Sequence, residues 1–120
     1  MSKPRIYTSY FANLRNIPSN IEPMAISLFT PSFYQGKRLW ELAPSKEILN
    51  SYKEGLIDED QYRELYLDLL MTKSSAIERC VKYFKEHEVV LVCYEGKGKF
   101  CHRHILGELF SGLGFDVVEY

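Results

Sequence analysis

The chain has 120 residues, of which 46% are hydrophobic and 26% are charged, as expected for an ordinary single globular domain over residues 1–120. Its 15 basic and 16 acidic side chains leave a formal net charge of −1, which excludes the broad basic surface of a dedicated duplex-DNA binder. No apolar run approaches the roughly 18 residues that cross a bilayer, and no signal-peptide core is recognisable, so we expect a cytoplasmic protein without a membrane partner. The odd number of cysteines, three, favours reduced thiols over a disulfide framework.

The first third of the chain predicts two strands and an irregular segment. Residues 5–11 alternate and are rich in aromatic and β-branched types, which favours a strand. Residues 24–29 form a short apolar run between prolines and predict a second strand, after a loop with at most one helical turn. Residues 31–44 show no period, and we expect them to lie over the sheet with Trp40 and Leu42 as anchors.

Two helices are predicted next from their caps. Ser45 can accept a hydrogen bond from a free backbone amide and so begin a helix over residues 46–54. Asp58 and Gln61 have the spacing of a capping box. The apolar positions that follow have helical spacing, and they are Tyr62, Leu65, Tyr66, Leu69 and Leu70.

The C-terminal part predicts a helix and then a strand–helix–strand unit. Ser75 and Glu78 resemble a capping pair for a helix that runs to about residue 87. Residues 89–94 are apolar at both odd and even positions, so both faces of the strand would be buried, which is typical of a central strand in a parallel sheet. A helix over residues 101–113 and a last strand in DVVEY complete a βαβ unit with parallel strands.

The stretch VCYEGKGKFCHRH, residues 92–104, lies where parallel α/β sheets bind ligands, after the carboxyl end of a strand. Gly96 and Gly98 allow close approach of a ligand, and the first amides of the following helix favour an anion. Lys99 and Arg103 add positive charge at the same place. The stretch therefore predicts a phosphate or carboxylate site, although it matches neither the dinucleotide fingerprint nor the P-loop.

The same stretch also carries reactive groups. Helical geometry turns His102 inward and His104 toward solvent. Cys101 at a helix N-terminus beside basic groups is a candidate nucleophile, His102 a proton carrier and Glu95 a general base, whereas Cys93 is a candidate resolving thiol. Each also has a structural interpretation, as a cap, a satisfied core-edge histidine, a loop charge or a small buried hydrophobe. The cysteine spacing lacks the short pairs of zinc sites, so no metal or cofactor is predicted.

At this point the sequence resembles the DUF488 family of small α/β proteins of uncharacterised function. The resemblance spans nearly the whole chain, through IYTSYF, LAP at 42–44, IDEDQYRELYLDLL, VCYE and CHR. Cys93 and Glu95 fall on the family's Cys-x-Glu positions, and residues 101–103 fall on its Cys-His-Arg positions. The chain reads ISLFTP where many relatives carry an Asp-x-Arg pair. The resemblance implies an α/β fold, a three-layer sandwich around a short, mostly parallel sheet, but it names no reaction.

Three functions fit these observations. The first is a pocket for a phosphate-bearing or nucleotide-like small molecule, lined by Thr8, Tyr10, Cys93 and Glu95, with Lys99 and Arg103 as the anion seat and Tyr rings or Trp40 stacking on a base. The second is a cysteine-dependent enzyme, for thiol redox chemistry or sulfur transfer, with Cys101, His102 and Glu95 as catalytic residues. The third is a nucleic-acid or protein-interaction module built on the lysine loop and residues 29–40. The oligomeric state is open.

Overall fold

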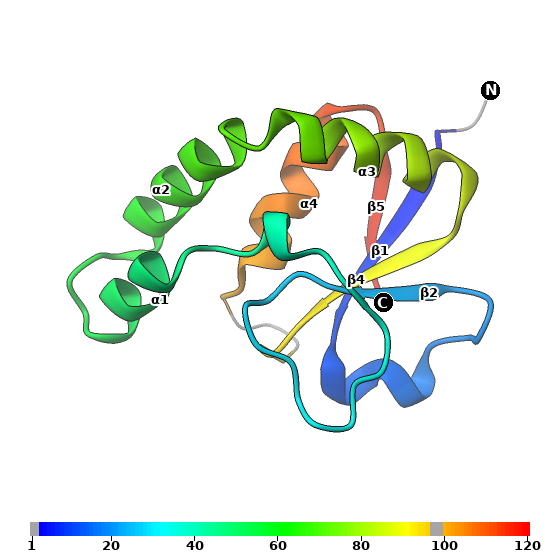
Figure 1. Cartoon of the computed structure of the whole chain (residues 1–120), viewed down its shortest axis with the longest axis horizontal. Coiled ribbons are helices and arrows are strands. Elements are labelled where there is room, and N and C mark those ends of the chain that lie inside the picture. The colour runs from blue at the N-terminus through cyan, green and yellow to red at the C-terminus, as the bar shows by residue number, and fades with distance from the viewer. Residues whose placement is uncertain (1–2, 97–99) are drawn as a thin grey trace.

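The computed structural model describes residues 3–96 and 100–120. Five strands, four α-helices and two 3₁₀-helices follow one another in this part of the chain (Figure 1). In chain order they are β1 (Arg5–Tyr10), η1 (Phe11–Asn16), β2 (Glu22–Ala25), β3 (Lys37–Arg38), η2 (Trp40–Leu42), α1 (Lys46–Lys53), α2 (Glu59–Met71), α3 (Ser74–Glu86), β4 (Val89–Cys93), α4 (His102–Gly112) and β5 (Asp116–Glu119). No helix within these residues has the length and apolar character to cross a bilayer.

The strands form one parallel sheet in the order β3-β2-β4-β1-β5. All five residues of β4 are buried, which confirms the prediction of a central strand from a run that is apolar at both parities. β1 lies between β4 and β5, so the C-terminal βαβ unit crosses over β1 before β5 is added at the edge. The α/β class and the parallel sheet are therefore as predicted.

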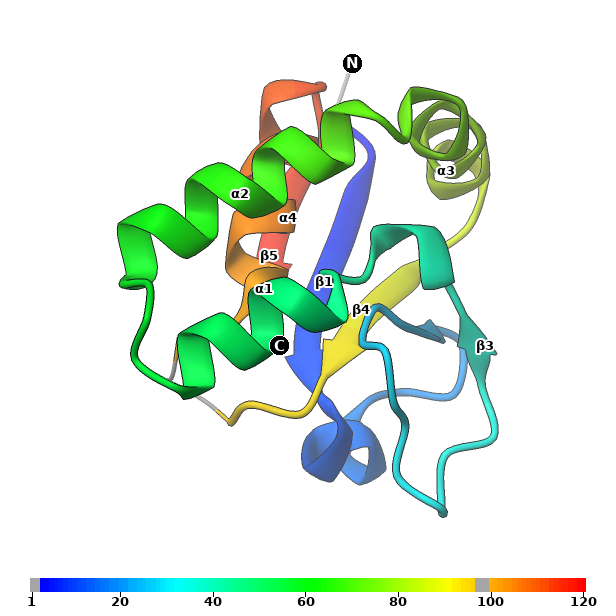
Figure 2. The same cartoon turned by 60° about the vertical axis from the view of Figure 1, so that its left-hand side comes forward.

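Each face of the sheet packs against a different layer. The larger core joins one face to helices α2, α3 and α4, with buried residues that include Ile6, Leu91, Tyr66, Phe84 and Phe110. Figure 2 shows α1 and α2 side by side on one flank of the molecule. A smaller core covers the opposite face, where Phe11 of η1 packs with Ala25, Val90 and Val92. The result is a three-layer arrangement with one thick and one thin outer layer.

The carboxyl ends of β1 and β4 mark the point where the chain changes direction. After β1 the chain continues through η1 toward β2, whereas after β4 it continues through α4 toward β5 at the other end of the sheet. The two connections also contribute to opposite faces. In open α/β sheets such a switch point leaves a crevice in which ligands bind.

The helix caps show where nearby side chains determine the first residue of a helix. Ser45 accepts from the Ile48 amide at 3.2 Å, and both hydrogen bonds of the predicted Asp58–Gln61 capping box are present. The predicted cap at Ser75 is wrong, because α3 already begins at Ser74 with Lys73 as N-cap. Only Thr72 and Lys73 separate α3 from α2, and this short connection sets the start of the helix instead of a side-chain cap.

Three predictions for the first 44 residues are corrected. The strand predicted over 24–29 lies at Glu22–Ala25, because its pairing with β4 starts at Glu22 opposite Val89 and ends with the Ile26 amide, which donates to the Val92 carbonyl at 3.0 Å. Within the segment predicted to be irregular, β3 adds a two-residue edge strand. Leu42 is fully buried as expected, but Trp40 is 53% exposed and packs against Arg38, with the guanidinium carbon 4.6 Å from the ring centroid. Trp40 is therefore not an anchor.

Candidate active site

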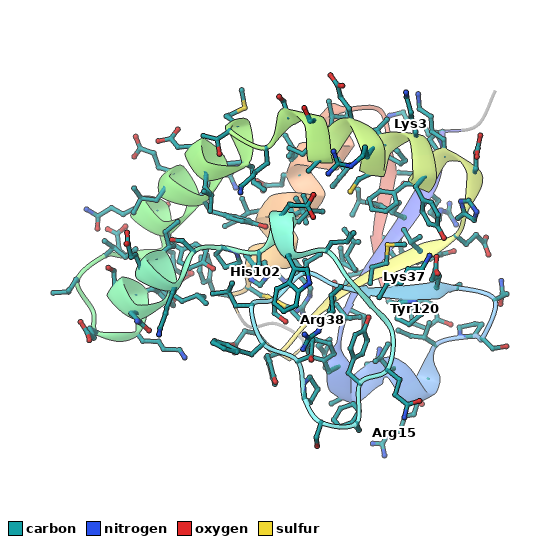
Figure 3. All side chains as sticks on the ribbon, in the orientation of Figure 1. Lys3, Arg15, Lys37, Arg38, His102 and Tyr120 are labelled. Atoms are coloured by element: carbon teal, nitrogen blue, oxygen red, sulfur yellow. A yellow bond between two sulfur atoms is a disulfide. The ribbon has the colours of Figure 1, made fainter. Side chains whose placement is uncertain are left out.

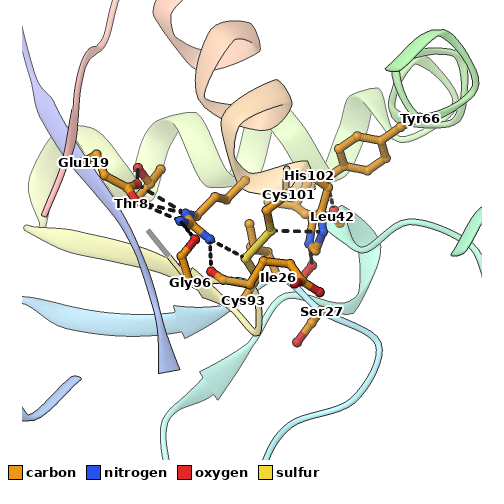
Figure 4. Close-up of a disulfide and its surroundings, with 12 residues drawn as sticks. Thr8, Ile26, Ser27, Leu42, Tyr66, Cys93, Gly96, Cys101, His102 and Glu119 are labelled. Atoms are coloured by element: carbon orange, nitrogen blue, oxygen red, sulfur yellow. Dashed lines mark hydrogen bonds and ion pairs between the residues drawn. A yellow bond between two sulfur atoms is a disulfide. The ribbon is translucent and has the colours of Figure 1, made fainter. Parts of the chain in front are cut away.

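Cys93 and Cys101 are joined as a disulfide at the switch point (Figure 4). Cys93 is the last residue of β4, and Cys101 is the N-cap residue of α4, with Cα atoms 7.6 Å apart. Both are buried. The odd number of cysteines carries no information about which thiols the fold brings together, and here it brings Cys93 and Cys101 together. The third cysteine, Cys80, is free and lies on the buried side of α3, and burial raises its pKa to about 11.

His102 points inward, as the helical arithmetic predicts, and His104 is exposed. The Nε2 atom of His102 lies 2.6 Å from the Ile26 carbonyl oxygen, and its Nδ1 atom lies 3.7 Å from Cys101 Sγ. Because a carbonyl can only accept, Nε2 carries the hydrogen, and Nδ1 presents a lone pair to the sulfur. Burial lowers the pKa of His102 to about 4, so the ring is neutral at physiological pH.

Arg103 is completely buried, and all five of its N–H groups are donated. Nε donates to the Glu119 carboxylate at 3.2 Å, and Nη2 donates to Glu119 at 2.8 Å and to the Gly96 carbonyl at 3.2 Å. Nη1 donates to the Glu95 carbonyl and to Cys93 Sγ, the latter at 3.1 Å. The guanidinium is thus a fixed part of the site, with one cationic N–H directed at a sulfur.

Glu119 balances this buried charge. It lies opposite Thr8 in the β1–β5 register, and the Thr8 hydroxyl donates to it. Burial raises the pKa of Glu119, but the hydrogen bonds from Arg103 and Thr8 outweigh burial and lower the pKa below its ordinary value. Glu119 and Thr8 lie on one side of the disulfide and His102 on the other (Figure 4). The polar neighbour of Cys93 Sγ is the Arg103 guanidinium, and that of Cys101 Sγ is the His102 imidazole.

The disulfide forms part of the wall of a cavity of about 770 Å³. Its lining is largely apolar and rich in aromatic rings, and it comes from the segment after β2, from α1, from the start of α2 and from the two ends of the 93–102 segment. Figure 3 shows His102 at the meeting point of these elements. The lining residues include Phe29, Tyr52, Lys53, Tyr62, Cys93, Tyr94, Glu95, Phe100, Cys101 and His102.

The predicted site residues are divided by the structure. Cys93, Glu95, Cys101 and His102 all line the cavity. Thr8 and Arg103 instead join Glu119 behind the disulfide, and Tyr10 lies beside them, with its ring centroid 5.7 Å from the guanidinium carbon. Lys99 lies outside the described residues. In the part of the chain that the structure describes, no three His, Cys, Asp or Glu side chains gather as a metal site would require.

The sequence interpretation missed three kinds of residue. Glu119 is one, and its signal was a charged residue after the two valines of the short final strand DVVE. Tyr62 of α2 was named only as an apolar position with helical spacing and Tyr52 of α1 was not singled out, and helical spacing gives no indication that these rings line a cavity. The Ile26 carbonyl has no sequence signal at all, because any residue carries one.

Comparison with known proteins identifies a family. Searches of curated proteins and of solved structures found no match. Residues 15–113 match the model of the DUF488-N3a family, described as the active DUF488-N3 subclade. This match covers most of the chain and includes both cysteines, His102 and Arg103. The protein with its strand-end cysteine pair therefore belongs to the DUF488 family.

Proposed function

We propose that this protein is a cysteine-dependent enzyme whose Cys93 and Cys101 alternate between a dithiol and a disulfide. The observation that supports the proposal is the position of the joined sulfurs on a cavity wall, with His102 beside one and Arg103 beside the other. The sequence predicts a cytosolic protein, and disulfides in that compartment are mostly transient and catalytic or redox-sensing. The description of the matched subclade as active accords with an enzyme.

Cys101 is the nucleophile in this proposal. In the dithiol form its thiol faces the lone pair of His102 Nδ1 and stands at the positive end of the α4 dipole. Cys101 attacks one sulfur of a small disulfide, and His102 accepts the thiol proton. Because burial makes His102 a weak base, it passes this proton on to the departing thiolate. The products of this step are a mixed disulfide on Cys101 and one substrate thiol.

Cys93 resolves the mixed disulfide. The Arg103 guanidinium, 3.1 Å from Cys93 Sγ, favours the thiolate over the thiol. Cys93 releases its proton to solvent, and its thiolate then attacks Cys101 Sγ. A bond forms between the two cysteines, the bond from Cys101 to the substrate sulfur breaks, and the second substrate thiolate leaves and takes up a proton from solvent. Two electrons pass from the dithiol to the substrate disulfide, which becomes two thiols. Microscopic reversibility then assigns Cys101 as the sulfur that a reducing thiolate attacks, with Cys93 as leaving group.

Trapping the mixed disulfide tests these roles. The reduced protein and its single serine variants are treated with bis(2-hydroxyethyl) disulfide, quenched in acid and measured by mass spectrometry. We expect Cys93→Ser to accumulate the adduct on Cys101, wild type to pass directly to the disulfide, and Cys101→Ser to form an adduct on Cys93 at a much lower rate. Cys80→Ser is the control and should behave as wild type, because Cys80 lies outside the cavity. Equal trapping by both site variants, or none by either, would overturn the proposal.

A nucleotide-like ligand is a second proposal, favoured by the aromatic lining and by Lys53 on the cavity wall. Arg103 cannot serve as its phosphate seat, because all five of its N–H groups are already donated. Thermal unfolding with AMP and with adenosine tests this proposal. Stabilisation by AMP but not by adenosine would support a phosphate site, and no shift with either would count against it. The lysines of a nucleic-acid module, at 97 and 99, lie outside the described residues, so that function stays a prediction.

A further inference from the structure

We infer that the cavity beside the cysteine pair binds a flat, uncharged aromatic group carried by a small thiol or disulfide substrate. This inference rests on the proposed thiol–disulfide function, and it names the class of molecule on which the cysteines act. Its basis is the arrangement of rings and charges around the cavity.

Three rings form one continuous wall. Tyr52 of α1 and Tyr62 of α2 meet edge to face with ring centroids 5.4 Å apart. Phe100 contacts both, at 5.1 Å from Tyr52 and 5.0 Å from Tyr62. Aromatic pairs favour offset and edge-to-face contacts at these distances, so a further ring could join the cluster in the same geometry.

Two more rings line the cavity while remaining open to water. Phe29 is 64% exposed and Tyr94 is 51% exposed. Tyr94 is supported from behind by Phe11, with ring centroids 5.0 Å apart. Exposed aromatic surface beside a cavity is a common mark of a ligand site, because a bound apolar group removes that surface from water.

The charges around the cavity favour a ligand without net charge. Among the described lining residues, Lys53 and Glu95 contribute one charge of each sign, and His102 is neutral. A substrate with several charged groups, such as a peptide disulfide, would find few groups of opposite charge among the lining residues that the structure describes. The volume of about 770 Å³ suits a ligand of small-molecule size, since such sites span roughly 300–1,000 Å³.

The sulfurs share the cavity with the rings. Cys101 directly follows Phe100, and both line the same space. A substrate whose ring rests against Phe100 and Tyr52 therefore has its sulfur close to Cys101 Sγ, with His102 Nδ1 on the same sulfur. In this arrangement binding of the ring places the reacting atom, which is how positioning contributes to rate.

Two disulfides with similar leaving thiols test the inference. We compare 2-hydroxyethyl benzyl disulfide with bis(2-hydroxyethyl) disulfide as oxidants of the reduced protein and divide each rate by that for free dithiothreitol. We expect at least a tenfold preference for the benzyl compound. Phe29→Ala should reduce this preference several-fold, whereas Phe33→Ala should leave it unchanged. Phe33 is a matched control, because it is 62% exposed in the same segment but belongs to a different surface hollow.

A binding measurement separates this inference from the proposed function. Benzyl methyl sulfide cannot exchange, and we titrate it into the oxidised protein while following resonances of Tyr52, Tyr62 and Phe100 by NMR. Shifts without any oxidation by the disulfides would support the aromatic site and refute the redox function. Oxidation without benzyl preference and without shifts would support the redox function and overturn the aromatic site. Unaltered preference in Phe29→Ala together with shifts at other residues only would also overturn it.

Discussion

The stability of the protein at acid pH should depend on His102, a residue of the candidate site. Its pKa of about 4 in the folded protein lies below the ordinary value of 6.5, so between these pH values the unfolded chain binds a proton that the folded chain excludes. The free energy of unfolding should therefore fall as pH falls through this window, by a total on the order of 3 kcal/mol.

Replacing His102 tests this pH dependence. His102→Gln keeps an amide donor for the Ile26 carbonyl but cannot titrate. Urea unfolding at pH 7 and at pH 4.5 should show a smaller loss of stability on acidification in the variant than in wild type. His104→Gln is the control and should retain most of the loss, because His104 is exposed. Equal losses in wild type and His102→Gln would contradict the neutral, buried imidazole.

Arg103 should set the acidity of Cys93. Arg103→Lys retains a positive charge but has three donors in place of five and cannot hold Glu119, Cys93 and both carbonyls together. We expect the apparent pKa of the Cys93 thiol to be higher in Arg103→Lys than with Arg103 present, by about one unit or more.

The measurement is the alkylation rate of Cys93 against pH in a Cys101→Ser background, with and without Arg103→Lys. Cys80 does not interfere at neutral pH, because burial raises its pKa to about 11. An unchanged profile would show that the contact between Arg103 and Cys93 has no effect on the thiol.

For single residues, the sequence indicated where a side chain would lie better than it indicated what that side chain would contact. Cys93, Glu95, Cys101 and His102 line one cavity, as expected of residues between a strand end and a helix start. Arg103 was interpreted as an anion seat because its charge is visible in the sequence, whereas its partner Glu119 comes from a distant strand. Which charges neutralise each other depends on strand order, and strand order is not a local property.

At the scale of elements, the caps hold the helices that carry the aromatic wall. Asp58 accepts from the Gln61 amide at 2.8 Å and begins α2 just before Tyr62. Asp58→Ala should lower the free energy of unfolding by about 1 kcal/mol, as typical for loss of an N-cap. Urea unfolding measures this change. Asp60→Ala, in the same turn but not the cap, should cost clearly less, and equal losses would show that the cap contributes nothing specific.

Elements with local signals were predicted well, and those without them were not. The boundaries of α1 and α2 follow from Ser45, Asp58 and Gln61, whose side chains bond to nearby amides. β2 was displaced in the prediction because the apolar run continues past Ala25, although β2 ends at Ala25 and only the Ile26 amide still donates to the Val92 carbonyl of β4. The edge strand β3 has only two residues, too few for any periodicity to be read.

At the scale of the whole molecule, Glu119 joins β5 to the centre of the fold through Arg103 and, through Thr8, to β1. Glu119→Gln removes the charge that balances a fully buried guanidinium. We expect a clear loss of stability, smaller than the ~3–5 kcal/mol of a fully buried pair because the Glu119 side chain is 29% exposed.

Asp116→Asn is the matched control, on the same strand. Asp116 pairs with Arg5 at 2.8 Å, but both side chains are largely exposed, 43% and 55%. Its replacement should cost no more than ~1 kcal/mol. Urea unfolding of both variants at pH 7 provides the comparison, and a similar loss in each would show that burial of Arg103 does not strengthen its dependence on Glu119.

The place of β1 in the sheet has a consequence for biosynthesis. β1 pairs on one side with β4 and on the other with β5, so Thr8 meets a residue 111 positions later. When a ribosome has made only the residues before Val89, β1 has neither of its partners. Its backbone groups and Ile6 then stay open to water or to a chaperone. The nascent chain can complete its sheet only after its last strand has emerged.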